Sequence, residues 1–259
     1  MNTSNKQLIK TPYDIIAQLE LKNITAGYED KIVIENISLI LQKGEIISLI
    51  GKSGIGKSTL LNAISGLIEP KEGKVYLMGK DITGTTGNVS YMLQKDLLLP
   101  FKTVLDNIAM PLIIKGKTKK EARELAKNSL AEFGLEGYEK KYPSSLSGGM
   151  KQRAALLRSY LFSKDVIMLD EPFSSLDYIT KLKMYAWFTD MVSRLGISAI
   201  FITHDIQEAL TLSDKIYLLY GKPAHIKFAM DMSDKSIKDP LNPKFAKNKK
   251  ILLDMIEES

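Results

Sequence analysis

Short apolar runs separated by glycines and polar turns recur along this chain. Residues 17–50 alternate apolar and polar positions in several places, a period that predicts short β-strands. The run Ile46–Ile50 is apolar except at Ser48, as in a strand buried on both faces. Val75–Met78 and Val89–Leu93 are further strand candidates, separated by turns rich in glycine and threonine. The first part of the chain is therefore predicted to be mainly β.

A helical period replaces this alternation between Asp96 and about Tyr142. Within Thr118–Phe133, apolar side chains recur at i, i+3, i+4, i+8 and i+11, the spacing of one helix face. The residues at these positions are Ala122, Leu125, Ala126, Leu130 and Phe133. We interpret this part as a helical insertion between two halves of an α/β core.

Helices and strands alternate in the part of the chain that follows. The predicted elements are a helix from about Gly148, a strand over Val166–Leu169, a helix from about Tyr178 to Arg194, and strands over Ser198–Thr203 and Lys215–Leu219. This alternation is typical of a mostly parallel sheet with helices on both faces, which predicts the α/β class. A short tail after Gly221 ends in a predicted amphipathic helix, Phe245–Ile256.

Composition and charge narrow the class of protein. The 259 residues are 44% hydrophobic, which suits a globular protein of one or two domains. The net charge of +6, with lysines gathered in Lys115–Lys127 and Lys235–Lys250, fits solubility, an anionic membrane surface or nucleic acid. The absence of cysteine excludes disulfides, thiolate metal sites and a cysteine nucleophile. No apolar run approaches the roughly 18–20 residues that span a bilayer, and residues 1–14 do not resemble a signal peptide, so we expect a soluble, cytoplasmic chain.

Residues 51–59, GKSGIGKST, match the phosphate-binding pattern G-x-x-x-x-G-K-[ST] at every fixed position. They lie between the predicted strand and a predicted helix, so backbone N–H groups and the positive end of the helix point at one spot. Lys57 is expected to neutralise the β- and γ-phosphates, and Ser58 to place its hydroxyl on Mg²⁺. The predicted nucleotide-binding residues are Gly51, Ser53, Gly54, Gly56, Lys57, Ser58 and Thr59. The alternative is a glycine-rich turn without a ligand.

A pair of carboxylates follows the apolar run Val166–Leu169. A carboxylate at the C-terminal end of a strand, beside a phosphate loop, suits a Mg²⁺ shell, and we assign this role to Asp170. Glu171 is then placed to orient an attacking water or to accept its proton. The alternative is an acidic pair that caps the next helix.

A second candidate anion cradle lies at Leu146–Met150, LSGGM. Ser147 with Gly148 and Gly149 at a helix start presents backbone N–H groups to an anion. Two cradles in one chain make sense if the second serves the nucleotide of another subunit. The alternative is an ordinary helix capped by serine.

These three motifs, in their order along the chain, resemble those of the ATP-binding subunits of ATP-binding cassette (ABC) transporters. GKSGIGKST resembles the Walker A loop, VIMLDE resembles Walker B with its catalytic glutamate, and LSGGM resembles the signature motif with Met150 in place of glutamine. The resemblance covers about Leu19 to Gly221 and implies a P-loop NTPase fold with an antiparallel β subdomain and an inserted α-helical subdomain. The expected ATPase domain is 17–221, with core parts 17–94 and 154–221, a helical subdomain at about 95–153 and a short C-terminal extension at 222–259.

The resemblance also implies roles for further residues. Gln94 is similar to the Q-loop glutamine, which implies contact with Mg²⁺ and the attacking water, and His204 is similar to the switch histidine at the γ-phosphate. Asp177 closes a D-loop-like segment, SSLD, in the nucleotide site, and Tyr28 resembles the aromatic residue that stacks on adenine. The plainer alternatives are a surface glutamine, a core histidine and a turn aromatic.

Partners follow from the same resemblance. It implies that ATP and Mg²⁺ lie between Walker A of one subunit and Ser147–Gly149 of another, in a head-to-tail homodimer at the cytoplasmic face of the cell membrane.

Leu97–Asn107 looks like a segment of importers for nitrate, sulfonates and taurine, with Phe101 in place of tryptophan. Importers of pyrimidine vitamin precursors look alike in this segment. We therefore expect membrane permease subunits as partners, and an extracytoplasmic solute-binding protein indirectly. The apolar cluster of this segment is expected to receive a short permease helix, or else to pack the insertion on the core.

Two other classes compete with an importer subunit. A soluble ABC ATPase that acts on ribosomes or in iron–sulfur cluster assembly shares the motifs, but the ribosomal proteins usually carry two cassettes and the cluster-assembly ATPase lacks the Leu97–Asn107 pattern. A nucleic-acid-binding protein is suggested by net charge only. Because the lysine-rich segments have no interleaved stacking aromatics, we expect no nucleic-acid partner.

Overall fold

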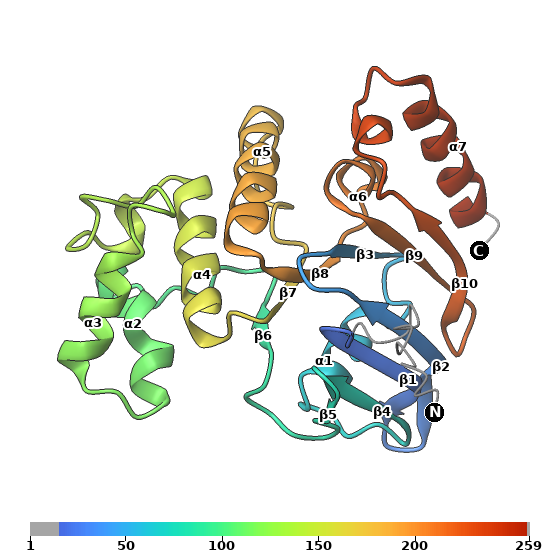
Figure 1. Cartoon of the computed structure of the whole chain (residues 1–259), viewed down its shortest axis with the longest axis horizontal. Helices are drawn as coiled ribbons and strands as arrows, with labels where there is room; N and C mark the ends of the chain where they lie inside the picture. The colour runs from blue at the N-terminus through green and yellow to red at the C-terminus, as the bar shows by residue number, and fades with distance from the viewer. Residues whose placement is uncertain (1–15, 258–259) are drawn as a thin grey trace, which may run out of the picture.

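Two β-sheets form the framework of the computed structural model, which describes residues 16–257 (Figure 1). The smaller sheet is antiparallel with the strand order β2-β1-β4-β5, and the larger has the order β10-β9-β3-β8-β7-β6. From β9 to β6 the strands of the larger sheet run parallel, and β10 pairs antiparallel with β9 at one edge. The predicted α/β class with a mostly parallel sheet is confirmed.

The strands follow the apolar runs of the sequence closely. The smaller sheet comprises β1 (Leu19–Tyr28), β2 (Lys31–Leu41), β4 (Glu72–Leu77) and β5 (Lys80–Asp81). The larger sheet comprises β3 (Ile46–Ile50), β6 (Ser90–Met92), β7 (Val166–Asp170), β8 (Ser198–Ile202), β9 (Lys215–Tyr220) and β10 (His225–Asp231). The helices are α1 (Lys57–Ile64), α2 (Val104–Ile114), α3 (Lys119–Asn128), α4 (Gly148–Phe162), α5 (Tyr178–Leu195), α6 (Ile206–Leu212) and α7 (Pro243–Glu257), with short 3₁₀ turns at Pro143–Ser145 and Lys235–Lys238.

The larger sheet is buried on both faces because its central strands are almost wholly apolar. Strands β3 and β8 are buried at every position. Ile47 and Leu49 pack in one cluster with α1 and the smaller sheet, whereas Leu169 and Phe201 pack in a second cluster with α4 and α5. Helix α1 therefore lies between the two sheets (Figure 1), and burial on both sides of it holds the loop that precedes it in place.

Aromatic contacts tie the helical insertion to the core. Phe133, which is fully buried, follows α3, and its ring centroid lies 5.7 Å from that of Tyr160 in α4. The same ring meets Trp187 of α5 edge-on at 5.8 Å. The guanidinium carbon of Arg153, also in α4, lies 4.7 Å from the centre of the Trp187 ring. The helix that begins at LSGGM is thus packed directly against α5.

The helix predicted over Thr118–Phe133 is shorter in the structure and ends at Asn128. Leu130 and Phe133 lie in the turns that follow, yet both are buried. Leu125, at a predicted core position, is 42% exposed. The apolar positions of this segment therefore mark where the chain is buried. Only those up to Asn128 lie in a helix.

The tail beyond Gly221 contains a strand that the hydrophobic pattern did not predict. Strand β10 alternates exposed and partly buried positions, as an edge strand does, and pairs with β9. Helix α7 confirms the predicted C-terminal helix. The domain division stays a prediction, and α4 runs across its boundary at residue 153. No helix within residues 16–257 has the length and apolar character to cross a bilayer.

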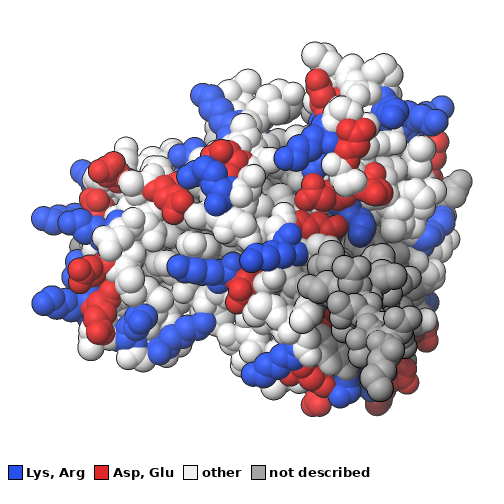
Figure 2. Space-filling view, in the orientation of Figure 1, with Lys and Arg blue, Asp and Glu red and all other residues white. Residues whose placement is uncertain are grey.

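Charge is spread over the surface. Figure 2 shows basic and acidic side chains interspersed over the described part of one face. Several pair with each other: Lys74 lies 2.7 Å from Asp81, and Arg194 lies 2.9 Å from Asp190. The net positive charge therefore gives no reason by itself to assign a nucleic-acid partner.

Candidate active site

A pocket of about 650 Å³ opens where β3, β7 and β8 end, facing the start of β2. Carboxyl ends of parallel strands meet at one edge of a sheet, so segments distant in the chain converge there. The predicted site residues that line it are Tyr28, Ser53, Gly54, Gly56, Lys57, Ser58, Thr59, Gln94, Asp170 and Glu171. The pocket therefore joins the phosphate loop to the paired carboxylates.

The phosphate loop is closely packed on the strands beneath it. Gly51 has φ +148° and Gly56 has φ +119°, backbone angles that favour glycine. A Cβ on Gly51 would lie 2.7 Å from the Leu219 carbonyl oxygen, and one on Gly56 would lie 2.7 Å from a methyl carbon of Ile34. Neither glycine has room for a side chain, which explains why the pattern needs glycine at these positions.

Lys57 closes the loop from inside. Its ammonium donates hydrogen bonds to the carbonyl oxygens of Gly51 at 2.8 Å and Lys52 at 3.0 Å. Burial lowers the pKa of Lys57, and the charges of Glu171 and Asp170 act against that shift. A buried ammonium that faces two carboxylates in an open pocket is suited to binding an anionic ligand.

Asp170 lies between the phosphate loop and β6. Its Oδ2 accepts hydrogen bonds from the Ser58 hydroxyl at 3.2 Å and from the Tyr91 hydroxyl at 3.4 Å. Burial raises the pKa of Asp170, the neighbouring Glu171 charge adds to the rise, and the Ser58 hydrogen bond opposes it. Tyr91 was not predicted as a site residue, although its position three residues before Gln94 places it on the strand that leads there.

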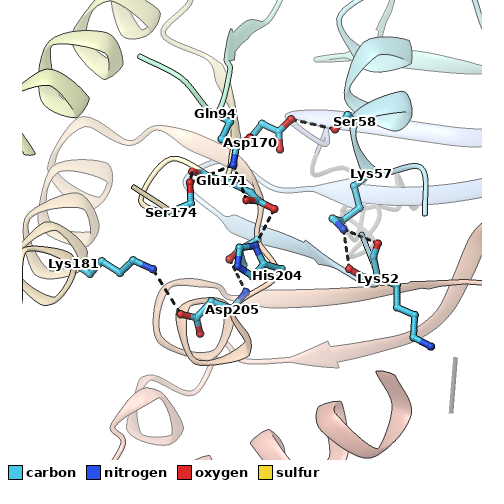
Figure 3. A network of polar contacts seen from close by, with 12 residues as sticks. Lys52, Lys57, Ser58, Gln94, Asp170, Glu171, Ser174, Lys181, His204 and Asp205 are labelled. Atoms are coloured by element: carbon cyan, nitrogen blue, oxygen red, sulfur yellow. Dashed lines mark hydrogen bonds and ion pairs between the residues drawn. The ribbon is translucent and has the colours of Figure 1, made fainter. Parts of the chain in front are cut away.

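Glu171 is held between two other predicted catalytic residues (Figure 3). Its Oε2 accepts a hydrogen bond from Gln94 Nε2 at 3.1 Å, and its Oε1 lies 2.9 Å from His204 Nδ1. Glu171 has φ +45°, a left-handed conformation that is costly for a residue with a side chain, and its N–H donates to the Ile202 carbonyl. The structure thus brings Gln94, Glu171 and His204 together in one connected group.

Tyr28 stands at the edge of the pocket, where β1 ends. Its side chain is 48% exposed, and its hydroxyl accepts a hydrogen bond from Asn62 Nδ2 at 3.0 Å. Lys31, Lys222 and Pro223 line the same pocket and were not predicted. Lys31 begins β2, whereas Lys222 and Pro223 follow the end of β9. None of the three belongs to a motif, so only the fold reveals their place. Stacking of Tyr28 on adenine stays a prediction.

The second anion cradle lies outside this pocket. Ser147 caps α4, and its hydroxyl oxygen accepts the Met150 N–H at 3.4 Å. Gly148 and Gly149 pack on the start of α5, where Asp177 caps that helix by accepting the Thr180 N–H at 3.0 Å. None of Ser147, Gly148, Gly149 and Asp177 lines the pocket. Within one chain, the Ser147–Gly149 cradle therefore does not line the pocket that the phosphate loop lines.

Comparison with known proteins identifies relatives over most of the chain. The ABC transporter family model matches residues 34–174. The formylaminopyrimidine import ATP-binding protein ThiZ of Halalkalibacterium halodurans is 44% identical over 193 residues, which cover 74% of this chain and 75% of that protein. The aliphatic sulfonates import ATP-binding protein SsuB 1 of Rhodococcus jostii is 40% identical over 208 residues, covering 80% and 81%. The taurine import ATP-binding protein TauB of Escherichia coli is 34% identical over 250 residues, covering 93% and 97%.

Solved structures agree with this grouping. An ATP-binding cassette in a dimeric post-hydrolysis state, bound to ADP and phosphate, matches with a TM-score of 0.68 and 30% identity over 83% of this chain and 98% of that one. The predicted P-loop NTPase fold of the ABC type is confirmed. The relatives are import subunits, which sets aside the soluble non-transport ATPase. The chain belongs to the ABC transporter family and is an ATP-binding, ATP-hydrolysing subunit of an ABC importer.

Proposed function

We propose that this subunit energises uptake of a small solute by hydrolysing ATP in a site that two copies of the chain complete together. The observation that supports this most directly is the separation of the two anion cradles. Lys57 and Glu171 face one pocket, while Ser147 lies outside it. A head-to-tail homodimer places the Ser147–Gly149 cradle of each copy over the pocket of the other, so that each ATP contacts both subunits.

The pocket residues suit ATP with Mg²⁺. The glycine-rich loop and Lys57 bind the phosphates, and Tyr28 stacks on the adenine. Mg²⁺ prefers oxygen ligands and usually takes one or two carboxylates together with substrate phosphates. Asp170, the Ser58 hydroxyl beside it and the Gln94 side-chain oxygen provide that donor set. When bound, the ion neutralises charge on the phosphates during transfer.

Glu171 is the proposed general base of hydrolysis. Its carboxylate orients a water molecule toward the γ-phosphate and accepts a proton from it. Gln94 and His204 already touch its two oxygens, so they set the direction in which the carboxylate points. His204 also contacts the γ-phosphate, and Lys57 stabilises the charge that develops there.

A second, largely apolar groove is proposed to receive the permease. Its volume is about 480 Å³, and it lies between α2, α4 and the end of α1. Among its lining residues are Leu97, Met110, Ile114 and Phe162. A groove of this character suits the apolar face of a short helix from a membrane subunit. The face that carries this groove would then lie against the cytoplasmic side of the membrane.

The segment Leu97–Asn107 takes part in this groove only through its first residue. Leu97 is 51% exposed and lines the groove, whereas Leu98 is buried in the core. Phe101 is 72% exposed and is not among the lining residues. Leu98 packs the insertion on the core, and we propose that Leu97 contributes to the surface that receives the permease helix.

Arg158 connects the proposed docking groove to the active site. Its guanidinium donates hydrogen bonds to the carbonyl oxygens of Leu97 at 2.8 Å and Asp96 at 2.6 Å. These residues follow Gln94 closely, and Arg158 belongs to α4, the helix that Ser147 caps. A helix seated in the groove would thus press on a segment that is joined to both anion cradles.

The solute class is proposed from the relatives. They serve import of formylaminopyrimidine, aliphatic sulfonates and taurine. We propose a solute of this kind, either a nitrate-, sulfonate- or taurine-like anion or a vitamin precursor. The permease, with an extracytoplasmic solute-binding protein, would select it, because the ATPase does not touch the solute.

Asp170→Asn tests the proposed metal ligand through stability. Burial raises the pKa of Asp170, so this group's contribution to stability is full at low pH and is lost as pH rises through the raised value. The nucleotide-free variant should therefore melt higher than wild type at pH 7, with the difference shrinking as pH falls toward about 4. It should also lose the extra stabilisation that Mg²⁺ gives with ATP.

Asp81→Asn is the control with the opposite sign, because Lys74 and Thr83 lower the pKa of Asp81. This variant should melt lower than wild type at pH 7 and keep the full response to ATP with Mg²⁺. Thermal unfolding at several pH values, with EDTA or with ATP and Mg²⁺, gives the comparison. Lower stability of nucleotide-free Asp170→Asn at pH 7, together with an intact Mg²⁺ response, contradicts the assignment.

Glu171→Gln tests the proposed base. The amide keeps the shape of the side chain but cannot accept the proton, so hydrolysis should fall by about 10²–10⁴-fold while ATP still binds. The variant should accumulate as an ATP-bound dimer, which light scattering detects. Glu136→Gln, an exposed site in the helical insertion, serves as control. Phosphate release at the wild-type rate by Glu171→Gln would contradict the proposal that Glu171 is the general base.

Leu97→Asp and Ile114→Asp test the docking groove. An aspartate there must be desolvated against an apolar helix, so permease co-purification and solute uptake should each fall about tenfold or more. ATP binding should be unchanged, because neither residue lines the nucleotide pocket. Leu241→Asp, at a side chain that is 91% exposed and outside the groove, is the matched control. Wild-type uptake by both groove variants would refute the docking site.

A further inference from the structure

The turn between β9 and β10 reaches the nucleotide pocket, although it lies beyond the part of the chain that carries the motifs. Lys222 and Pro223 line this pocket together with the phosphate loop. The resemblance to ABC subunits ended at about Gly221 and left residues 222–259 as a C-terminal extension. The first two residues of that extension therefore form part of the pocket wall.

Close backbone approaches place this turn beside the phosphate loop. A Cβ on Gly51, the first residue of the loop, would lie 2.7 Å from the carbonyl oxygen of Leu219, near the end of β9. On the other side of the turn, the Ala224 N–H donates to the Val33 carbonyl oxygen at 2.8 Å. The same Val33 oxygen would lie 3.5 Å from a Cβ on Gly56. One end of the turn thus lies against the loop, and the other lies against the strand β2 that packs under it.

The backbone of the turn is held in one place. Ala224 is buried, and its carbonyl oxygen accepts the Glu35 N–H at 2.9 Å, so both of its backbone groups bond to β2. Gly221 has φ +86°, and a Cβ there would lie 2.9 Å from the His225 ring. The His225 ring meets the Tyr220 ring edge-on, with the centroids 6.0 Å apart. A side chain on this turn is therefore presented to the pocket from a fixed position.

Lys222 brings a positive charge to this wall. Its side chain is exposed, and in the part of the chain that the structure describes no carboxylate or carbonyl group is bonded to its ammonium. The Lys57 ammonium, by contrast, already binds two carbonyl oxygens of the loop. A lysine is a point charge on a flexible four-carbon stem, so it can follow a ligand in the pocket. Beside a phosphate loop, the natural partner of such a charge is a phosphate oxygen.

We propose that Lys222 is a further nucleotide-binding residue, whose ammonium contacts the phosphates of ATP from the wall that the C-terminal extension forms. The proposal rests on the assignment of this pocket to ATP. A contact with phosphate oxygens at the edge of the site is made before and during hydrolysis, so it should lower KM for ATP and leave kcat unchanged. The extension is then part of the ATPase site.

Lys222→Met tests this contact in the purified full-length protein, because methionine removes the charge and keeps an unbranched side chain. KM for ATP should rise about fivefold to tenfold at low salt, with kcat within about twofold of wild type. Lys222→Arg keeps the charge, so its KM should stay within about twofold of wild type. Lys235→Met, at an exposed lysine of the same extension that does not line the pocket, is the matched control and should be unchanged.

Salt separates an electrostatic contact from a change in packing. The ratio of KM between Lys222→Met and wild type should fall below about twofold when salt is raised from about 50 mM to about 500 mM, because ions screen an exposed charge. Without nucleotide, the variant should melt within about 1 °C of wild type, since the substituted side chain is exposed. A KM ratio that stays the same at high salt overturns the proposal.

Inorganic tripolyphosphate, supplied with Mg²⁺, identifies the part of ATP that Lys222 contacts. As a competitor of ATP hydrolysis it lacks ribose and base, so Lys222→Met should raise its inhibition constant by about the same factor as KM for ATP. A higher KM for ATP with an unchanged inhibition constant for tripolyphosphate would place the contact on the nucleoside and overturn the proposal.

Lys57→Ala shows which of the two assignments fails if a result is negative. If Lys57→Ala has the wild-type KM for ATP, the assignment of the pocket is wrong and the role of Lys222 falls with it. If Lys57→Ala loses ATP binding while Lys222→Met keeps the wild-type KM at low salt, the pocket assignment stands and only the role of Lys222 is overturned.

Discussion

The buried ammonium of Lys57 is the interaction on which the rest of the site depends. It closes the glycine loop by binding the Gly51 and Lys52 carbonyls, and it faces the carboxylates of Asp170 and Glu171. The loop can take this shape only because it joins a strand that is buried on both faces to a helix between two sheets. The cost of burying the charge is offset by those carbonyls and by the anionic ligand that the pocket accepts. The buried core thus holds the Lys57 ammonium in place at the N-terminus of α1.

The parallel sheet gathers the remaining chemistry around this point. Strands β3, β6, β7 and β8 end at a common edge, which brings Gln94, Glu171 and His204 together although they are far apart in sequence. Ser147 cannot join them within the same chain, since it caps a helix of the insertion. The proposed mechanism follows from this division: one copy supplies a pocket with a strained, oriented glutamate, and a second copy supplies the other anion cradle.

Patterns in the sequence predicted the features that depend on interactions between residues close together in the chain. The strand before the phosphate loop, the loop glycines, the two carboxylates and the serine at the start of α4 were all predictable from residues that act on their own neighbours. The hydrogen bond from Tyr91 to Asp170 and the edge strand β10 were not predictable, because each depends on segments that the fold brings together. The end of α3 was misjudged for a related reason: Leu130 and Phe133 are buried by tertiary packing after the helix has stopped.

The composite site is tested most directly by mixing two disabled variants. Lys57→Ala destroys the pocket of its own chain and leaves its signature cradle, whereas Ser147→Arg blocks the cradle and leaves the pocket. Each should be inactive alone, yet an equimolar mixture should recover about one quarter of wild-type ATP hydrolysis, because half of the dimers are mixed and one of their two sites is intact. A mixture that stays inactive, or full hydrolysis by Ser147→Arg alone, would contradict the account.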